Sequence, residues 1–132
     1  MQVLCHHLYE YQKGLRPLVL HTMKSKDRAA AEAKLQSYDV DYLVIPVSTG
    51  KINIFFGCSE CVDVVRSFGA KPLNQLTLEQ DFILGTMLGY DRQAQCERYL
   101  QRSKQQARPI AINNGAIKIN LNNEFYPNVG IA

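Results

Sequence analysis

The sequence YLVIPVSTGKINIFFGCSECVDVVRSF, residues 42–68, contains two runs rich in β-branched and aromatic residues and then an apolar pattern of helical spacing. The runs 42–47 and 52–56 predict two strands, and the turn residues 48–51 between them predict a hairpin. Pro46 lacks an N–H group, so we expect its strand at a sheet edge or a bulge. Cys61, Val62, Val65 and Phe68 predict the buried stripe of a helix.

The rest of the chain adds further helices and one more strand. Helical spacing predicts a helix over 2–13, and Pro17 can begin a short buried strand within 15–23. Ser25 is the expected N-cap of an alanine-rich helix through Ser37, and Thr77 with Gln80 forms a capping box for another helix. A last helix follows residue 91. The expected fold is α+β, with a small three-stranded sheet and about five helices in a two-layer sandwich.

The domain organisation follows from where this pattern ends. We expect a single α+β domain over residues 1–108 and an extension over 109–132. In the extension, IAINNGAIKINL places two short alternating runs around Asn113-Asn114-Gly115, which predicts a β-hairpin. The polar residues after it leave a flexible tail as the alternative.

Composition restricts the class of protein. The chain has 132 residues, a hydrophobic fraction of 46% and a net charge of +3, as expected for one folded domain. This charge is too small to require nucleic acid or a membrane as a partner. No apolar run approaches the roughly 18 to 20 residues of a spanning helix, and no secretory signal is recognisable. The four cysteines lack the spacing of a disulfide framework, so we expect a cytoplasmic protein with reduced thiols.

The pair Cys58 and Cys61 permits a redox interpretation. A C-x-x-C motif before a helix is the arrangement of thioredoxin-like proteins, in which one thiol attacks and the other resolves. The preceding hairpin is not the βαβ context of that motif, and Glu60 between the thiols should raise their pKa. Cys61 also falls on the buried stripe. Structural packing is therefore the favoured interpretation, and redox chemistry the alternative.

Histidines near the N-terminus permit a metal site. His7 lies on the apolar stripe of its helix, and His21 lies in a strand that can pass beneath it. Imidazole and thiolate groups bind transition metals, so His7, His21, Cys58 and Cys61 are the candidate ligands. Two histidines alone form a weak site, and hydrogen-bonded core histidines are the favoured interpretation. We expect no cofactor.

Two groups of residues are candidates for binding a partner. Lys13 and Arg16, with Lys24 and Lys26, form a basic patch that could receive an acidic protein face or a phosphate. Phe82 and Met87 belong to the wide apolar stripe of the helix after Thr77. A solvated helix end explains the basic patch equally well.

Three stretches, HHLYEYQKGLRPLVLHT, KINIFFG and RSFGAKPLNQLTLEQDFILGTMLGYDRQAQCERYL, resemble a small bacterial family of unknown function. The similarity covers roughly residues 1–104. It implies a three-stranded, five-helix α+β domain that dimerises, and it implies no catalytic residues. Members are often encoded near flavodoxin, which implies a role in flavodoxin-linked electron transfer.

No nucleotide-binding loop, no nucleophile elbow and no pair of acid residues in a predicted cleft is present in the sequence. The leading hypothesis is therefore a non-enzymatic accessory protein, a cytoplasmic homodimer that binds flavodoxin or another acidic protein. A thiol redox or metal-binding protein is the alternative. A sensor of small anions at the Lys13–Arg16 patch is a third possibility.

Overall fold

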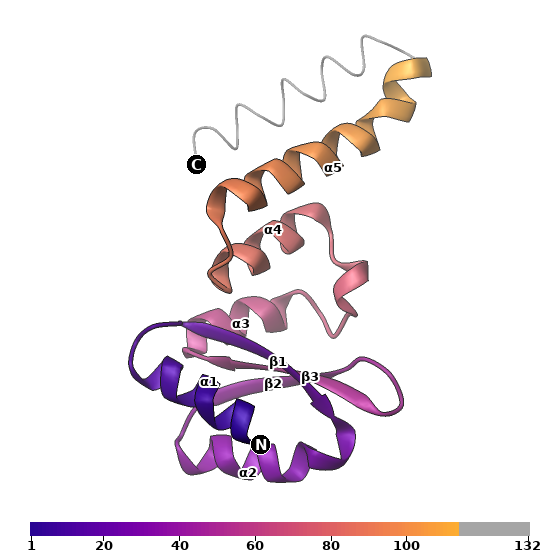
Figure 1. The fold of residues 1–132 in the computed structure, drawn as a ribbon. Helices are drawn as coiled ribbons and strands as arrows, with labels where there is room; N and C mark the ends of the chain where they lie inside the picture. Colours follow the sequence, from indigo (N-terminus) through magenta and orange to yellow (C-terminus); the bar gives the residue numbers. More distant parts are fainter. Residues whose placement is uncertain (114–132) are drawn as a thin grey trace. The chain divides into compact units, whose positions relative to one another are not determined.

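The computed structural model describes residues 1–113, with side chains through residue 106. The helices and strands in chain order are α1 (Gln2–Gln12), β1 (Leu18–Lys24), α2 (Arg28–Ser37), β2 (Asp41–Pro46), β3 (Lys51–Gly57), α3 (Ser59–Ser67), α4 (Leu78–Met87) and α5 (Arg92–Asn113), as Figure 1 shows. Short 3-10 turns, η1 (Ser25–Asp27) and η2 (Leu73–Gln75), precede α2 and α4. Three strands and five helices confirm the predicted α+β class.

The sheet is antiparallel, and its last strand in chain order lies in the middle, in the order β1-β3-β2. Leu18 and Asp41 both lie opposite Gly57, and Lys24 lies opposite Lys51. Every residue of β3 after Lys51 is buried, because a central strand needs apolar side chains on both faces. Pro46 ends the edge strand β2, where a missing N–H group costs little, as expected.

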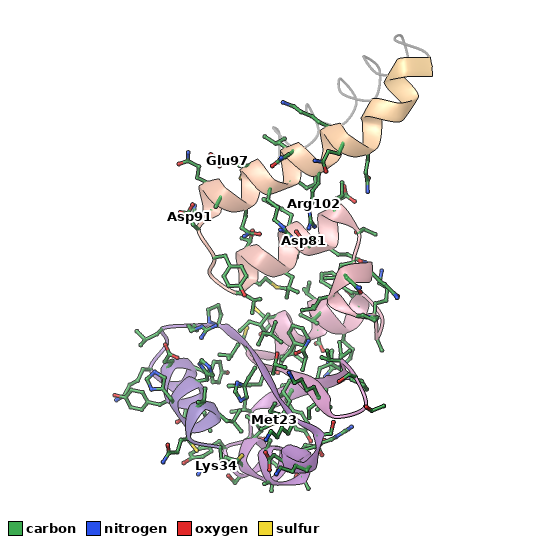
Figure 2. The ribbon with its side chains drawn as sticks, turned by 45° about the vertical axis from the view of Figure 1, so that its right-hand side comes forward. Met23, Lys34, Asp81, Asp91, Glu97 and Arg102 are labelled. Carbon is green, nitrogen blue, oxygen red and sulfur yellow. The ribbon has the colours of Figure 1, made fainter. Side chains whose placement is uncertain are left out.

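The helices α1 and α2 cover one face of the sheet (Figure 1). Figure 2 shows Met23 on β1 at the side of the sheet facing α2, while Lys34 lies on α2 itself. The core on this face comprises the buried residues Leu4, Leu8, Val19, Met23, Ala31, Leu35, Val40, Ile52, Ile54 and Phe56.

The helix α3 covers the opposite face, and α4 contributes to the same core. That core comprises Leu18, Ile45, Phe55, Val62, Val65, Leu84 and Leu88. Helices on both faces make three layers, whereas the sequence led us to expect two. The reason lies in β3, where the adjacent side chains of Phe55 and Phe56 point to opposite faces and both require cover. The homodimer that the resemblance implies stays a prediction.

Most predicted helix ends are confirmed. Thr77 and Gln80 form the capping box of α4, and Gly69 and Gly89 follow α3 and α4 with φ near +83°. Ser25 is not the N-cap of α2. It begins η1 instead, and α2 starts at Arg28 without a side-chain cap.

The chain divides into two units, residues 1–92 and the segment from Gln93 onward. In the second unit α5 continues past Pro109 to Asn113, although the sequence predicts a new element at Pro109. The predicted hairpin lies mostly outside the described residues, as does the rest of the extension 109–132. No helix in the described part of the chain has the length and apolar character needed to cross a bilayer.

Candidate functional site

A cluster of polar side chains joins α1 to the start of β1. The rings of His7 and His21 lie 5.5 Å apart between centroids, because His21 is on the face of β1 that α1 covers. Nδ1 of His7 lies 3.1 Å from Oε1 of Glu10 and 3.3 Å from a guanidinium nitrogen of Arg16. The same Arg16 nitrogen is 3.7 Å from Glu10 Oε1. The predicted approach of His7 to His21 is confirmed.

In this cluster the positive charge of Arg16 offsets the negative charge of Glu10. A proton on Nδ1 lets His7 donate to Glu10, and a bare Nδ1 accepts from Arg16, so His7 has a partner in either state. Burial lowers the pKa of His21, and the nearby His7 and the N-terminal amine lower it further. His21 therefore stays neutral near pH 7. Sequence reasoning missed Glu10, although its spacing of three from His7 and four from His6 is the signal of helical side-chain pairs.

The metal-site hypothesis can be tested against these positions. The structure brings His7 to His21 and Cys58 to Cys61, but as two separate pairs. Among the described residues there is no group of three or more His, Cys, Asp or Glu side chains placed to hold a metal ion. A pair of ligands is too few for the tetrahedral sites that zinc prefers.

The second cluster lies where β3 passes into α3. Gly57 has φ +150°, and a Cβ atom there would lie 2.1 Å from the carbonyl oxygen of Pro17. The N–H of Cys58 donates to that same oxygen at 2.9 Å. Cys58 is the N-cap of α3, and Cys61 is its third helical residue. The sheet therefore fixes the position of both cysteines.

The two cysteines are neighbours at the start of α3, and Cys58 influences the pKa of Cys61. Burial raises the pKa of Cys61 to about 11, and a hydrogen bond between its thiol and Cys58, the charge of Cys58 and the charge of Glu60 add to the effect. The predicted influence of Glu60 is thus confirmed for Cys61. Tyr11 of α1 belongs to the same surroundings, since burial and then the charges of Cys58, Glu60 and Cys61 raise its pKa. Tyr11 comes near these thiols only through the tertiary fold, and its position in the sequence could not have predicted this proximity.

A groove of about 240 Å³ lies at the other end of the sheet, between the end of β2 and the segment 71–74. Its apolar lining consists of Ile45, Pro46, Val47, Phe55, Pro72 and Leu73. Val47 is 53% exposed and Leu73 is 40% exposed, so the rim of the groove offers apolar surface to solvent. The buried Asn53 at its base accepts a 2.6 Å hydrogen bond from Thr22, and Lys71 donates to Gln80 at 2.8 Å.

Three further lysines lie at the same end of the sheet as this groove. Lys24 and Lys51 lie opposite each other on β1 and β3, at the turn that also carries Val47. The N–H of Ser25 donates to the carbonyl of Gly50, which holds the segment with Lys26 against the same turn. Lys24, Lys26 and Lys51 are exposed, and none forms an ion pair with another residue of the described part of the chain. Like charges directly opposite each other on neighbouring strands repel, so this end of the sheet favours an anionic partner.

The predicted partner-binding residues lie apart. The single basic patch that we expected is divided, because Lys13 and Arg16 precede β1, whereas Lys24 ends β1 and Lys26 follows it, about 20 Å away along the strand. Lys13 is exposed above the ring of Tyr9, and Arg16 is engaged with His7. Phe82 is half-buried in α4, and Met87 packs against the core that α3 covers.

Comparison with known proteins identifies a family. The search of curated proteins found no match to this chain. A family model described as "Protein of unknown function (DUF2023)" matches residues 2–102, which is most of the chain and includes all three strands and the first four helices. The match agrees with the extent of the resemblance inferred from the sequence. The chain belongs to this family of proteins of unknown function.

Proposed function

We propose that this protein is a binding domain for an acidic protein, and that an apolar side chain of the partner enters the groove between β2 and η2. The observation that carries the proposal is the combination of half-exposed Val47 and Leu73 with three lysines that form no ion pair with any other described residue. Exposed apolar surface beside charges of one sign is the pattern of a selective binding surface.

The apolar groove and the three lysines have different effects on binding. Burial of one Leu- or Phe-sized side chain in the groove contributes about 1.5–3 kcal/mol. Lys24, Lys26 and Lys51 act at longer range, because their summed field increases the rate of encounter with an anionic surface at low salt. The net charge of +3 adds to this field. Affinity should therefore fall when salt screens the lysines.

Flavodoxin is the partner we propose. The resemblance described above implies an association with flavodoxin, and flavodoxins are acidic proteins as a class. In this proposal the protein itself performs no chemistry on flavodoxin and acts by occupying its surface, in the cytoplasm. The four free cysteines support the cytoplasmic location.

The test is a titration of fluorescently labelled flavodoxin with the full-length protein at low salt and again at 0.5 M NaCl. We expect saturable binding at low salt and a loss of at least tenfold in affinity at high salt. Lys51→Glu and Leu73→Asp should each weaken binding at low salt by about tenfold or more. Lys34→Glu is the matched control, because it changes the net charge equally but lies on α2.

The outcomes separate the parts of the proposal. Absence of binding at low salt removes flavodoxin as the partner. Binding that Lys51→Glu and Lys34→Glu weaken equally shows a net-charge effect and removes the groove as the site. Binding that only Lys51→Glu and Leu73→Asp weaken supports both parts.

We further propose that two copies of the chain associate through α1 and the segment that follows it. Met1, Val3, Tyr9 and Leu15 are large apolar residues with exposed side chains in this short region. Sedimentation equilibrium of the wild type and of Val3→Glu with Tyr9→Glu tests this. A monomeric wild type at micromolar concentration contradicts it, as does a dimer that the double variant leaves intact.

A further inference from the structure

We propose that Cys58 and Cys61 form a reversible intramolecular disulfide by exchange with an external disulfide of the glutathione type. Neither the family nor the proposed binding function assigns any chemistry to these residues. The site is the junction between β3 and α3, at the end of the sheet opposite the groove.

The backbone holds the pair in place from two directions. The carbonyl oxygen of Pro17 accepts the N–H of Cys58 at 2.9 Å, and the same oxygen leaves no room for a side chain at Gly57. The carbonyl of Cys58 then accepts the N–H of Val62 at 3.1 Å, which closes the first turn of α3. Cys58 therefore cannot move away from Cys61 without breaking both the strand pairing and the helix start.

The spacing of the cysteines brings the sulfur atoms together. An N-cap side chain and the side chain three residues later meet over the first helical turn, as in a capping box. Cys58 has the extended backbone of an N-cap, with φ −66° and ψ 144°, but its sulfur makes no capping hydrogen bond to the helix. Cys58 is close enough to Cys61 for its thiol to raise the pKa of Cys61. The N-cap and third helical positions thus place the two cysteines as neighbours, as a disulfide between them requires.

The surroundings assign different roles to the two thiols. Cys61 packs against the core formed by Val62 and Val65, and burial raises its pKa to about 11, so it remains a neutral thiol near pH 7. Cys58 is half-exposed and has no helix-capping bond to lose. We therefore assign Cys58 as the attacking group and Cys61 as the resolving group.

The exchange takes place in two steps. The thiolate of Cys58 attacks one sulfur of glutathione disulfide, which forms a mixed disulfide on Cys58 and releases one glutathione thiolate. The sulfur of Cys61 then attacks the Cys58 sulfur, loses its proton to the solvent, and releases the second glutathione thiolate. The two protons lost by the cysteines reappear on the two glutathione molecules. Cys58 and Cys61 are oxidised together, and one glutathione disulfide is reduced.

The experiment uses the full-length chain with Cys5→Ser and Cys96→Ser, because these two cysteines are exposed and would form their own adducts. The protein is equilibrated with glutathione disulfide, unfolded in guanidinium chloride so that burial no longer protects Cys61, treated with iodoacetamide, and digested with trypsin. Cleavage after Lys51 and Arg66 leaves both cysteines in one peptide, residues 52–66. We expect this peptide to be unalkylated and lighter by two hydrogens, and dithiothreitol to restore double alkylation.

Single variants in the same background test the roles. Cys61→Ser should accumulate one glutathione on Cys58, because no resolving thiol remains. Cys58→Ser should gain at least tenfold less adduct, because Cys61 is protonated and packed against the core. Far-UV circular dichroism confirms that each variant is folded.

A peptide 52–66 that stays doubly alkylatable overturns the proposal, and so does a product that carries glutathione on both cysteines. Equal adduct formation in the two single variants overturns the assignment of roles. The alkylation test of peptide 52–66 keeps both Cys58 and Cys61 unchanged. It can therefore overturn the proposal even if one of the single variants fails to fold.

Discussion

The carbonyl oxygen of Pro17 lies where the Cβ atom of any residue other than glycine at position 57 would stand, at a separation of 2.1 Å. Pro17 immediately precedes β1, whose Leu18 pairs with Gly57 on β3, so the two positions cannot separate without opening the sheet. The φ of +150° at Gly57 adds strain for any other residue.

We therefore expect Gly57→Ala to lower the free energy of unfolding by about 2 kcal/mol or more. Urea denaturation measures this change. Gly50→Ala is the control, because no atom lies within 4 Å of the position of its Cβ and its φ is not positive. That variant should stay within about 0.5 kcal/mol of the wild type. Equal costs for the two variants would show that the contact with Pro17 is not the cause.

The two phenylalanines at the centre of β3 should be equally important to stability. Phe55 is 1% exposed and Phe56 is 0% exposed, and they belong to the cores on opposite faces of the sheet. Phe55→Ala and Phe56→Ala should each cost about 3–5 kcal/mol in urea denaturation. Tyr90→Ala, at an exposed aromatic position, should cost less than about 1 kcal/mol. A large effect at only one phenylalanine would contradict the three-layer arrangement.

The low pKa of His21 predicts that acid weakens the fold. The unfolded chain binds a proton at His21 below the ordinary pKa of 6.5, and the folded chain does not until the pH is lower. The free energy of unfolding should therefore fall as the pH drops below 6.5. Around His21 the structure places His7, the N-terminal amine and, through His7, Glu10 and Arg16.

Thermal unfolding between pH 7.5 and 5 tests this prediction. His21→Gln should reduce the loss of stability on acidification, because glutamine does not titrate. The matched control is His6→Gln, whose side chain is 71% exposed in the wild type and should leave the slope unchanged. A wild-type slope in the His21→Gln variant would contradict the assignment of the effect to His21.

The pKa of Cys61 predicts slow alkylation at neutral pH. With a pKa of about 11, roughly one Cys61 thiol in a thousand is ionised at pH 8, and the rate with iodoacetamide should rise about tenfold per pH unit above that. Cys58→Ser removes the charge of Cys58 and its thiol but not the burial of Cys61. The pKa should therefore fall, and labelling at pH 9 should accelerate. Peptide mass spectrometry follows the labelling, with the exposed Cys5 as the internal reference. An unchanged rate in the variant would show that burial alone sets the pKa.

Local patterns predicted the elements of this fold well. The apolar run of β3, the turn before it, and the capping box of Thr77 and Gln80 are contained in short windows of sequence. The cover on both faces of the sheet was missed, although two adjacent phenylalanines in one strand already imply it. The position of β3 between β1 and β2 depends on the pairing of strands that are distant in sequence, and no local pattern specifies it.

In the candidate sites, too, the sequence predicted what local spacing determines and missed what depends on the tertiary fold. Cys58 at a helix start and His7 near His21 could be predicted, because spacing within one element or across one short connection determines them. The groove and its lysines could not, because Lys24 meets Lys51 only through the register of β1 on β3. The contact of Tyr11 with the surroundings of Cys58 likewise requires the tertiary fold.

The lysine on β1 and the proline on β2 have a consequence for self-association. Both outer strands of the sheet have one side without a partner strand among the described residues, and such edges recruit strands from other molecules. Lys24 would have to give up its hydration beside an incoming strand, and Pro46 offers no N–H group to it. Both edge strands are thus protected against edge-to-edge pairing into fibres. Two copies that associate would do so through helical surfaces, with their sheets kept separate.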